Sequence, residues 1–452
     1  MYNKMIIDNI IIGAGMAGSY IANCLREDNK DFIILESSYK IGGRHQTQKD
    51  KDKVLFEQGA WRIHSSHKRM IELCKKLKLT LIEFEKSQPY KRKKIPGLSA
   101  LDTIILEQEG DIKKSLEKEL NTGYQGVFEA DSTSHPYSIK EEGTYYIIKE
   151  GQEEIVSRLL KTLEKKVFLK HKVMDIEREK KGYKIKVLHN DKEKIFYCNN
   201  LFTSQYKYEL AKMKSIQTYI QPLIDSVLSI PLNHIYAYTE EDIKVDKKDR
   251  TNNNILSQVI NPTHDKNWFQ VSYSCGRIAD FWNRYMLKYG KEKTKNLIQK
   301  YVDVKIKDIK NYYWSYAFHM WRPVPNFNIK KAVDFSIQPN PVILDNFYLV
   351  GECFSSFQGW SEGALETCQK AISVYRGNKN KIYQQIPKQL SNYFIYNNII
   401  IEVKNWQNFH PGGKESITSH LGEDISKLFY FINHSELSWS ILYSYYWGYI
   451  KK

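Results

Sequence analysis

Three glycines and one acidic residue near the start of the chain have the spacing of a nucleotide-binding turn. The segment GAGMAG covers residues 13–18, follows an apolar run and precedes a helical pattern. In such a turn Gly13 permits a tight bend, Gly15 lets the backbone approach a pyrophosphate, and Gly18 lets the helix pack closely on the strand. Glu36 ends the next apolar run, near the spacing expected for an acid that binds an adenosine ribose. This combination predicts a dinucleotide site.

The C-terminal segment carries two histidines that could ligate a metal. His410 opens the sequence HPGG, and His434 follows 24 residues later. Together with Trp406 and Phe429, these residues resemble the pattern of cytochrome b5. The resemblance implies that the two imidazoles bind a haem b iron from opposite sides. Such an iron has no open position for oxygen, which favours electron transfer.

Three further motifs resemble the flavin amine oxidases when they are taken with the N-terminal turn. They are GGR at 42–44, VLFEQGAWRIH at 54–64 and VGECFSSFQGWSEGALETCQKA at 350–371. The resemblance covers roughly residues 5–376 and implies FAD as the cofactor. No cysteine occurs in 311–325, where a covalent flavin link would be sought, so we expect non-covalent FAD.

The resemblance also implies which residues contact FAD. Glu36 would bind the adenosine ribose, and the backbone of Val173 would meet the adenine. Arg44 would line the cofactor, and Glu352 would hold its ribityl and phosphate region. The backbone at Trp61 would lie beside the isoalloxazine ring. The full predicted set is Gly13, Gly15, Met16, Ala17, Gly18, Glu36, Gly43, Arg44, Gly59, Ala60, Trp61, Val173, Gly351, Glu352, Gly359, Trp360, Ser361 and Ala364.

Arg62, Trp360 and His234 are the predicted substrate residues. GAWRIH is similar to a segment of the L-amino acid oxidases whose arginine clamps the substrate carboxylate, although His64 replaces the family proline. The alternative is that Arg62 pairs with a structural acid. Trp360 matches the aromatic that flanks the amine, or else packs in the core. His234 lies about where many members have a lysine near flavin N5, or is a satisfied strand histidine. His319 is a further candidate.

The spacing of apolar residues predicts the elements that position these motifs. The fold class is α/β: an FAD-binding Rossmann-like domain, a mixed-sheet substrate domain and a small α+β cytochrome b5-like domain. The predicted flavin unit covers 1–376, a basic linker covers 376–381, and the haem module covers 382–452. Within the flavin unit, the FAD-binding parts are at about 1–70, 150–225 and 335–376, and the substrate parts are at about 71–149 and 226–334.

Several stretches carry more local predictions. Helical spacing runs over 65–84 and 151–166, and residues 85–149 read as an irregular insertion with short helical patches. One helix is predicted over 278–290 with a second at 290–302. The aromatic segment 314–325 ends in prolines and predicts a loop or a sheet edge.

Composition restricts the partners and the compartment. The formal net charge of +16 comes from lysines that are mixed with glutamates along the chain, which indicates a solvated surface and not a nucleic-acid site. The six scattered cysteines favour free thiols in a reducing compartment. An apolar strand within the first ten residues leaves no room for a signal peptide, and no apolar run approaches the roughly 18 residues of a membrane span. We therefore expect a cytoplasmic protein.

These features together predict FAD-dependent oxidation of an amine, with an L-amino acid as first choice, to an imine. The electrons would pass to oxygen, to a redox partner protein or to the fused haem. A polyamine or monoamine oxidase and a lipid or carotenoid desaturase are alternatives on the same fold, and Arg62 counts against a desaturase because that substrate has no carboxylate. A flavin–haem electron-transfer protein without an amine substrate is the third reading, which the missing family lysine favours.

Overall fold

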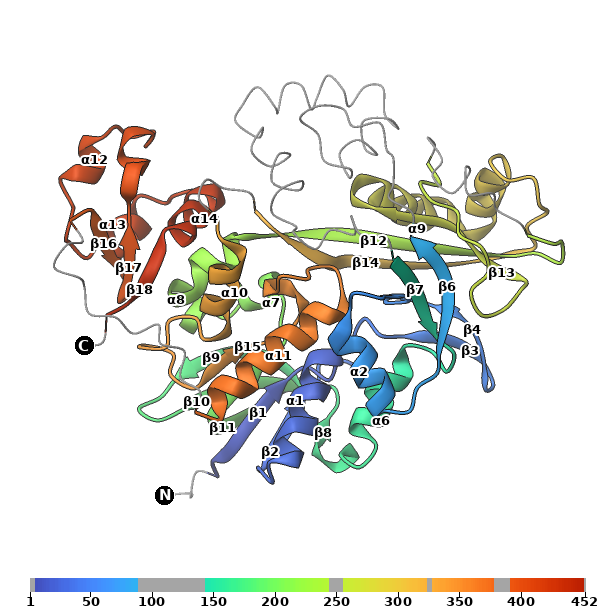
Figure 1. Ribbon diagram of the computed structural model, residues 1–452, viewed down its shortest axis with the longest axis horizontal. Helices are drawn as coiled ribbons and strands as arrows, with labels where there is room; N and C mark the ends of the chain where they lie inside the picture. The colour runs from blue at the N-terminus through green and yellow to red at the C-terminus, as the bar shows by residue number, and fades with distance from the viewer. Residues whose placement is uncertain (1–4, 88–142, 244–254, 323–326, 378–390, 451–452) are drawn as a thin grey trace.

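A computed structural model describes residues 5–87, 143–243, 255–322, 327–377 and 391–450. In this part of the chain Figure 1 shows a twisted sheet with helices against it, a second sheet of long strands and a small C-terminal module. The predicted mixed α/β class is confirmed by this arrangement. The helical patches expected between 88 and 142 and most of the predicted linker lie outside the described residues.

The first sheet has the order β8-β2-β1-β11-β10-β9, and β15 also pairs with β11. Strand β1 runs parallel to both β2 and β11. Along β1, Ile11 enters one hydrophobic core, whereas Ile10 and Ile12 enter the other, as alternation along a strand requires. The bounds are β1 Ile7–Ile12, β2 Phe32–Leu35, β8 Val167–Phe168, β9 Lys172–Arg178, β10 Tyr183–His189, β11 Lys192–Thr203 and β15 Phe347–Leu349.

Four helices share the core that Ile11 enters. Helix α1 packs against α6 and α11, and α11 also packs against α2. The beginning of the chain and the closing motif of the flavin unit are therefore neighbours in space (Figure 1). These helices are α1 Met16–Glu27, α2 Lys68–Lys76, α6 Glu153–Leu160 and α11 Ser361–Tyr375.

Two predicted helices are shorter than their sequence pattern. The helix expected over 65–84 ends at Lys76, because Lys78 takes a φ of +56° and the chain then enters strand β6. The helix expected over 151–166 ends at Leu160. Beyond it the backbone forms hydrogen bonds between residues three apart, such as that from the Leu163 N–H to the Leu160 carbonyl at 2.7 Å.

The second sheet has the order β13-β12-β14, and β12 and β14 pair antiparallel along nearly their whole length. Residues 314–321 therefore belong to an edge strand. Of the two predictions for this segment, a loop or a sheet edge, the sheet edge is correct for these residues. Helix α9 covers this sheet and contains a break at Gly290, with φ of +78°, so it consists of the two predicted helical pieces. The bounds are β12 Val227–Tyr238, β13 Trp268–Cys275, α9 Gly276–Gln299 and β14 Asp308–Trp321.

Two small sheets and the C-terminal module complete the described fold. The small sheets are the hairpin β3 Thr47–Asp50 with β4 Lys53–Glu57, and β5 Ile63–His64, β7 Gly143–Ile148 and β6 Leu81–Ser87 in the order β5-β7-β6. Three helices, α7 Lys207–Leu210, α8 Lys214–Asp225 and α10 Ile329–Ile337, precede or follow the long strands. The module contains β16 Tyr393–Tyr396, β17 Ile399–Glu402, α12 Glu415–Thr418, α13 Ser426–Phe431, α14 Glu436–Ser444 and β18 Tyr446–Tyr449.

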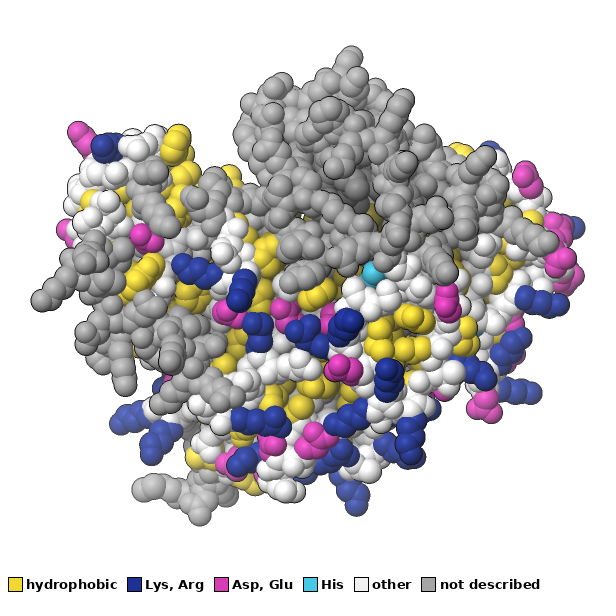
Figure 2. Space-filling model, in the orientation of Figure 1, with side chains coloured by type: hydrophobic (Ala, Val, Ile, Leu, Met, Phe, Trp, Pro, Cys, Tyr) yellow, Lys and Arg dark blue, Asp and Glu magenta, His cyan; other side chains and the backbone are white. Residues whose placement is uncertain are grey.

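The surface mixes charges of both signs, as the composition indicates. Figure 2 shows lysine and arginine side chains beside aspartate and glutamate over the described face. None of the helices in the described ranges has the length and hydropathy needed to cross a membrane.

A prediction follows from the glycine turn. A Cβ on Gly18 would lie 1.9 Å from the carbonyl oxygen of Gly13, so Gly18→Ala must move the backbone of the turn. We expect a loss of roughly 1–3 kcal/mol in the free energy of unfolding, measured by denaturant titration. Gly15→Ala is the control, because its φ is −84° and the nearest atom to its Cβ is 3.8 Å away. Equal stability of the two variants would contradict the packing assigned to Gly18.

Candidate functional site

The glycine turn leaves backbone N–H groups free at the start of α1. Gly13 has a φ of +98°, which favours glycine, and its N–H donates to the carbonyl of Leu35 at 2.8 Å. Gly15 is the N-cap of α1, and within the described residues no side chain caps this helix. Met16 and Ala17 follow and are buried. The positive end of the helix dipole is therefore available to a phosphate group.

Glu36 lies at the end of β2, beside this turn. Its carboxylate accepts hydrogen bonds from the backbone N–H groups of Ala14 at 2.7 Å and Ser38 at 2.8 Å. Gly43 packs against Gly15 on the other side of the turn. Ligands of parallel sheets bind at the carboxyl ends of the strands, which is where Glu36 stands. Val173 is buried on β9 of the same sheet.

A buried carboxylate joins the second glycine motif to the closing motif. Glu352 is 4% exposed and forms an ion pair with Nη1 of Arg44 at 2.8 Å. The other partners of Glu352 are His319, through its backbone N–H at 2.8 Å and Nδ1 at 3.0 Å, and the backbone N–H of Gly359 at 2.8 Å. Burial alone would raise the pKa of Glu352, but His319 and Arg44 together lower it well below its usual range. His319, which the sequence gives as a further candidate for the substrate site, thus forms hydrogen bonds with this carboxylate.

The segment from Gly59 to Arg62 runs close to the same place. A Cβ on Gly59 would lie 2.1 Å from the carbonyl oxygen of Arg44, and the N–H of Ala60 donates to that oxygen at 3.0 Å. Trp61 is 5% exposed and contacts Tyr273 edge to face. The predicted flavin-facing backbone and the predicted clamp are therefore held against the GGR motif.

Arg62 lies among aromatic rings. Its Cζ is 4.7 Å from the ring centre of Trp61, 4.6 Å from that of Tyr145 and 5.8 Å from that of Trp360. No carboxylate within the described ranges pairs with it, so the alternative of a structural ion pair finds no support there. Ring faces attract the cation but leave its five N–H donors unsatisfied. The half-buried guanidinium is thus arranged to receive an anion.

Trp360 connects this cluster to the closing helix. It is the N-cap of α11, in extended backbone, and its ring stacks at 6.4 Å on Tyr145 and meets His67 edge to face at 4.7 Å. Ser361 begins the helix and its Oγ contacts Nε2 of His45 at 2.9 Å. The remaining predicted contacts of this motif are Gly351, with φ of +115°, and the buried Ala364.

His234 is fully buried on β12. The amide of Gln270 donates to its Nδ1 at 2.9 Å, so Nε2 carries the proton, and Nε2 has no partner within the described residues. Burial, with a contribution from Arg62, lowers the pKa of His234 to about 3. The ring is therefore neutral at physiological pH. Only one of its two nitrogens has a hydrogen-bond partner in the described residues, so the alternative of a fully satisfied strand histidine holds only in part.

The sequence reasoning missed Tyr145, Tyr273 and His67. The sequence pattern predicts an irregular insertion around Tyr145, but Tyr145 lies on β7, which pairs with β5 so that Tyr145 is opposite His64. The run GTYYII at 143–148, which is rich in β-branched and aromatic residues after a glycine, is a signal that indicates this strand. Burial lowers the pKa of His67 to about 3, with His64 and Arg62 adding to the effect.

His434, a predicted iron ligand, is held in place within the C-terminal module. Its Nδ1 donates to the carbonyl of Phe429 at 2.9 Å, and its ring stacks on the Phe429 ring at 3.9 Å with planes 6° apart. Because Nδ1 donates, Nε2 keeps its lone pair for a metal. This outer hydrogen bond fixes both the tautomer and the ring direction.

His410 follows a short turn that contains Trp406. The N–H of Gly413 donates to the His410 carbonyl at 2.9 Å, which folds HPGG into a tight loop. Large apolar side chains of the module are exposed, including Phe409 at 72% and Ile432 at 55%. An apolar macrocycle would cover such side chains. The donor set and these apolar side chains fit a haem.

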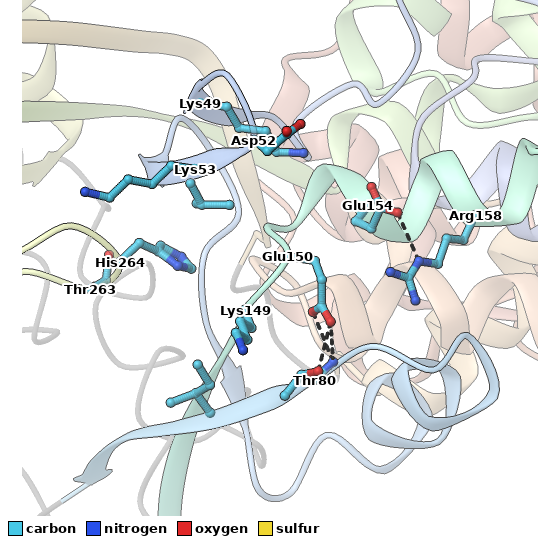
Figure 3. A pocket seen from close by; sticks show the side chains of 12 residues that line it. Lys49, Asp52, Lys53, Thr80, Lys149, Glu150, Glu154, Arg158, Thr263 and His264 are labelled. Atoms are coloured by element: carbon cyan, nitrogen blue, oxygen red, sulfur yellow. Dashed lines mark hydrogen bonds and ion pairs between the residues drawn. The ribbon is translucent and has the colours of Figure 1, made fainter.

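One hollow of the described surface lies away from these residues. This pocket has a volume of about 660 Å³ and lies between the β3–β4 hairpin, the end of β7 and α6. Figure 3 shows the charged side chains around it. Its cations are largely neutralised: Lys49 pairs with Glu153 at 2.8 Å and Arg158 with Glu154 at 3.0 Å. None of the predicted site residues lines it.

Two segments match known domain families. Residues 11–77 match the NAD(P)-binding Rossmann-like domain, and residues 379–451 match the cytochrome b5-like haem/steroid binding domain. The predicted cofactors, a dinucleotide in the first domain and a haem in the second, agree with both matches. The matches cover the GAGMAG turn, Glu36 and both candidate iron ligands.

Curated relatives resemble parts of the chain. An L-amino-acid oxidase of Mus musculus is 40% identical over 76 residues, which are 17% of this chain and 12% of that protein. An L-amino-acid oxidase of Crotalus adamanteus is 30% identical over 159 residues, 31% of this chain and 30% of that protein. The chain thus spans less than a third of the length of these relatives.

A solved structure extends the likeness at the level of the fold. A triple mutant of putrescine oxidase superposes with a TM-score of 0.57 over 82% of this chain and 99% of its own, at 14% identity. The chain therefore combines a Rossmann-like domain with a C-terminal cytochrome b5-like domain. Its fold is shared with an amine oxidase, and part of its sequence is similar to L-amino-acid oxidases.

Proposed function

We propose that the chain is an FAD-dependent oxidoreductase that converts an L-amino acid to its imine. The observation that carries this proposal is Arg62, a half-buried cation held by three aromatic rings with no carboxylate partner in the described residues. A guanidinium fork matches the two oxygens of a carboxylate. The sequence likeness of part of the chain to L-amino-acid oxidases supports the same substrate class.

FAD fits the residues of the N-terminal unit, which we place within 1–376. Glu36 would take the ribose, the start of α1 the pyrophosphate, and the start of α11 at Ser361 the flavin ring. The orphaned Nε2 atoms of His234 and His319 are buried polar atoms that a bound cofactor or its water could satisfy. When bound, FAD supplies the hydride acceptor of the reaction.

The side chains around Arg62 would orient the substrate and exclude water. Arg62 would hold the carboxylate, while Trp360 and Tyr145, whose rings lie 11° from parallel, would wall the amine-bearing carbon. His234 would offer its Nε2 proton as a hydrogen bond. Its low pKa prevents it from taking a proton from a substrate ammonium at neutral pH. His234 is therefore not the base that takes the proton of the substrate ammonium.

The haem module, which we place within 382–452, would accept electrons from the flavin unit. His410 and His434 would hold the iron of a bound haem, and a haem held by two imidazoles supplies one-electron transfer and not oxygen binding. Oxygen and a separate redox protein remain alternative acceptors in this proposal. None of the six cysteines, which all lie in the described ranges, forms a disulfide, in keeping with the cytoplasmic location that we infer from them.

A second function is favoured by one observation. At the place of the family lysine the chain carries the neutral, buried His234, so the flavin unit could relay electrons without oxidising an amine. A polyamine substrate is less suitable, because the cation of Arg62 would repel a second ammonium group.

An anaerobic titration separates these functions. The oxidised holoprotein is mixed with single L-amino acids and with the amines that result from their decarboxylation, and the flavin absorbance is followed. We expect bleaching with at least one amino acid and little with its amine. If no amine or amino acid bleaches the flavin, the oxidase function is refuted and the relay function stands.

Arg62→Ala tests the clamp. Loss of a charge-assisted pair in a desolvated site should cost roughly 2–5 kcal/mol of transition-state binding, measured as kcat/KM on the amino acid. Activity on the decarboxylated amine should change much less. Arg62→Lys keeps the charge but not the guanidinium fork, so its kcat/KM on the amino acid should lie between those of the parent and Arg62→Ala. Equal losses on both substrates would show that Arg62 only shapes the pocket.

His434→Ala tests the haem ligand. The variant should lose the absorbance of a six-coordinate haem because one axial ligand is missing, while substrate still bleaches the flavin. His420→Ala is the matched control, since His420 lies in the same module and pairs with Glu423 at 2.8 Å. An unchanged haem spectrum in His434→Ala would exclude this histidine from the iron.

A further inference from the structure

The C-terminal module is packed against the flavin unit. Helix α14 lies against α8 (Figure 1), and one hydrophobic core contains residues from both parts. Tyr396, Tyr446 and Tyr449 of the module are each at most 4% exposed. Trp321, the last residue of β14, stacks on Tyr443 of α14 at 6.3 Å with planes 11° apart. The module is therefore docked and not merely tethered.

Buried polar groups are also paired across this contact. The hydroxyl of Tyr443 donates to the carbonyl of Ala332 at 2.8 Å, and that of Tyr396 donates to the carbonyl of Thr218 at 2.8 Å. Polar groups at a buried contact are costly when unpaired, so these bonds favour one orientation of the module over others.

One ion pair bridges the two parts. Nη2 of Arg322 lies 2.7 Å from the carboxylate of Glu436, and the Arg322 side chain is 8% exposed. Nε of Arg322 donates to the carbonyl of Asp225 at 3.1 Å, and Nζ of Lys207 stands 3.8 Å from the same carboxylate. Glu436 is the first residue of α14, where the helix dipole favours an acid. A nearly buried arginine thus depends on an acid from the other part.

The position of this pair in the chain links the two candidate sites. Glu436 follows the candidate iron ligand His434 by two residues, and Arg322 follows His319 by three. His319 in turn holds Glu352, the acid of the predicted flavin site. The pair is therefore the contact between the segment that carries an iron ligand and the strand that lines the flavin site.

We propose that Arg322 and Glu436 are positioning residues that fix the haem module at one separation from the flavin site, so that electrons cross this contact without movement of the module. This inference rests on the proposed function of the two cofactor sites. Oxidation of one amine releases two electrons and two protons. The protons pass to solvent, and two one-electron transfers through the haem to a one-electron-accepting redox protein close the turnover.

Glu436→Gln and Glu436→Lys test the proposal in the holoprotein. The side chain of Glu436 is 61% exposed, so neither variant should prevent folding. Glu415→Gln is the matched control, because Glu415 is an exposed acid in the first turn of α12. A light flash in the presence of EDTA, which serves as the electron donor, reduces the flavin without an amine substrate, and the appearance of reduced haem is followed. Hydrogen exchange of residues 436–444 reports docking independently of electron transfer.

We expect the Glu436 variants to slow haem reduction roughly tenfold, as expected when one partner of a partly buried pair is lost. They should also raise exchange in α14 and leave the oxidised haem spectrum unchanged, with Lys more severe than Gln and Glu415→Gln like the parent. The proposal would be overturned if both Glu436 variants showed the rate of haem reduction and the hydrogen exchange of the parent. It would also be overturned if the haem of the parent stayed oxidised after its flavin had been reduced. The amine titration fails or succeeds separately, because the flash needs no substrate.

Discussion

The buried carboxylate of Glu352 is the interaction on which the described arrangement depends. Two distant segments and one nearby loop meet at it: Arg44 after the second glycine pair, His319 on the edge strand of the second sheet, and Gly359 before the closing helix. A charge at 4% exposure is stable only when its partners remain in place. The acid therefore fixes where the sheet that carries His234 lies relative to the nucleotide-binding sheet.

The same edge strand extends this constraint to the C-terminal module. Strand β14 holds Glu352 through His319, ends at Trp321 against Tyr443, and continues into Arg322, which meets Glu436. A shift of β14 would disturb the flavin-site acid and the docked module together. Coupling between the two candidate sites thus has a contiguous physical basis in one strand and its partners.

Local patterns made much of the fold predictable. The glycine turn, Glu36 and the start of α11 near Trp360 are set by residues close in sequence, and the structure places elements where these patterns indicate. The spacing of His410 and His434 likewise indicated a module that the domain match supports. Assignments of single residues to FAD, substrate or iron stay predictions.

Non-local pairing explains what the sequence did not reveal. Tyr145 reaches Arg62 only through the register of β5 and β7, which are about 80 residues apart, and no local pattern encodes that register. The pairing of Arg322 with Glu436 joins residues 114 apart. Helix ends were also missed, because a single left-handed residue such as Lys78 can stop a helix whose apolar spacing continues.

The electrostatics of the candidate pocket favour an anion. His67 and His234 both have a pKa near 3, lowered chiefly by burial and further by the nearby cation of Arg62. Both rings are therefore neutral at physiological pH, which leaves Arg62 as the charge among these three. Aromatic faces stabilise that cation but cannot accept its N–H groups in plane. A substrate carboxylate would satisfy those donors and cancel the charge at once, whereas a second ammonium would add to it. Under the proposed function, this charge would favour a carboxylate-bearing substrate before any contact with the side chain of that substrate.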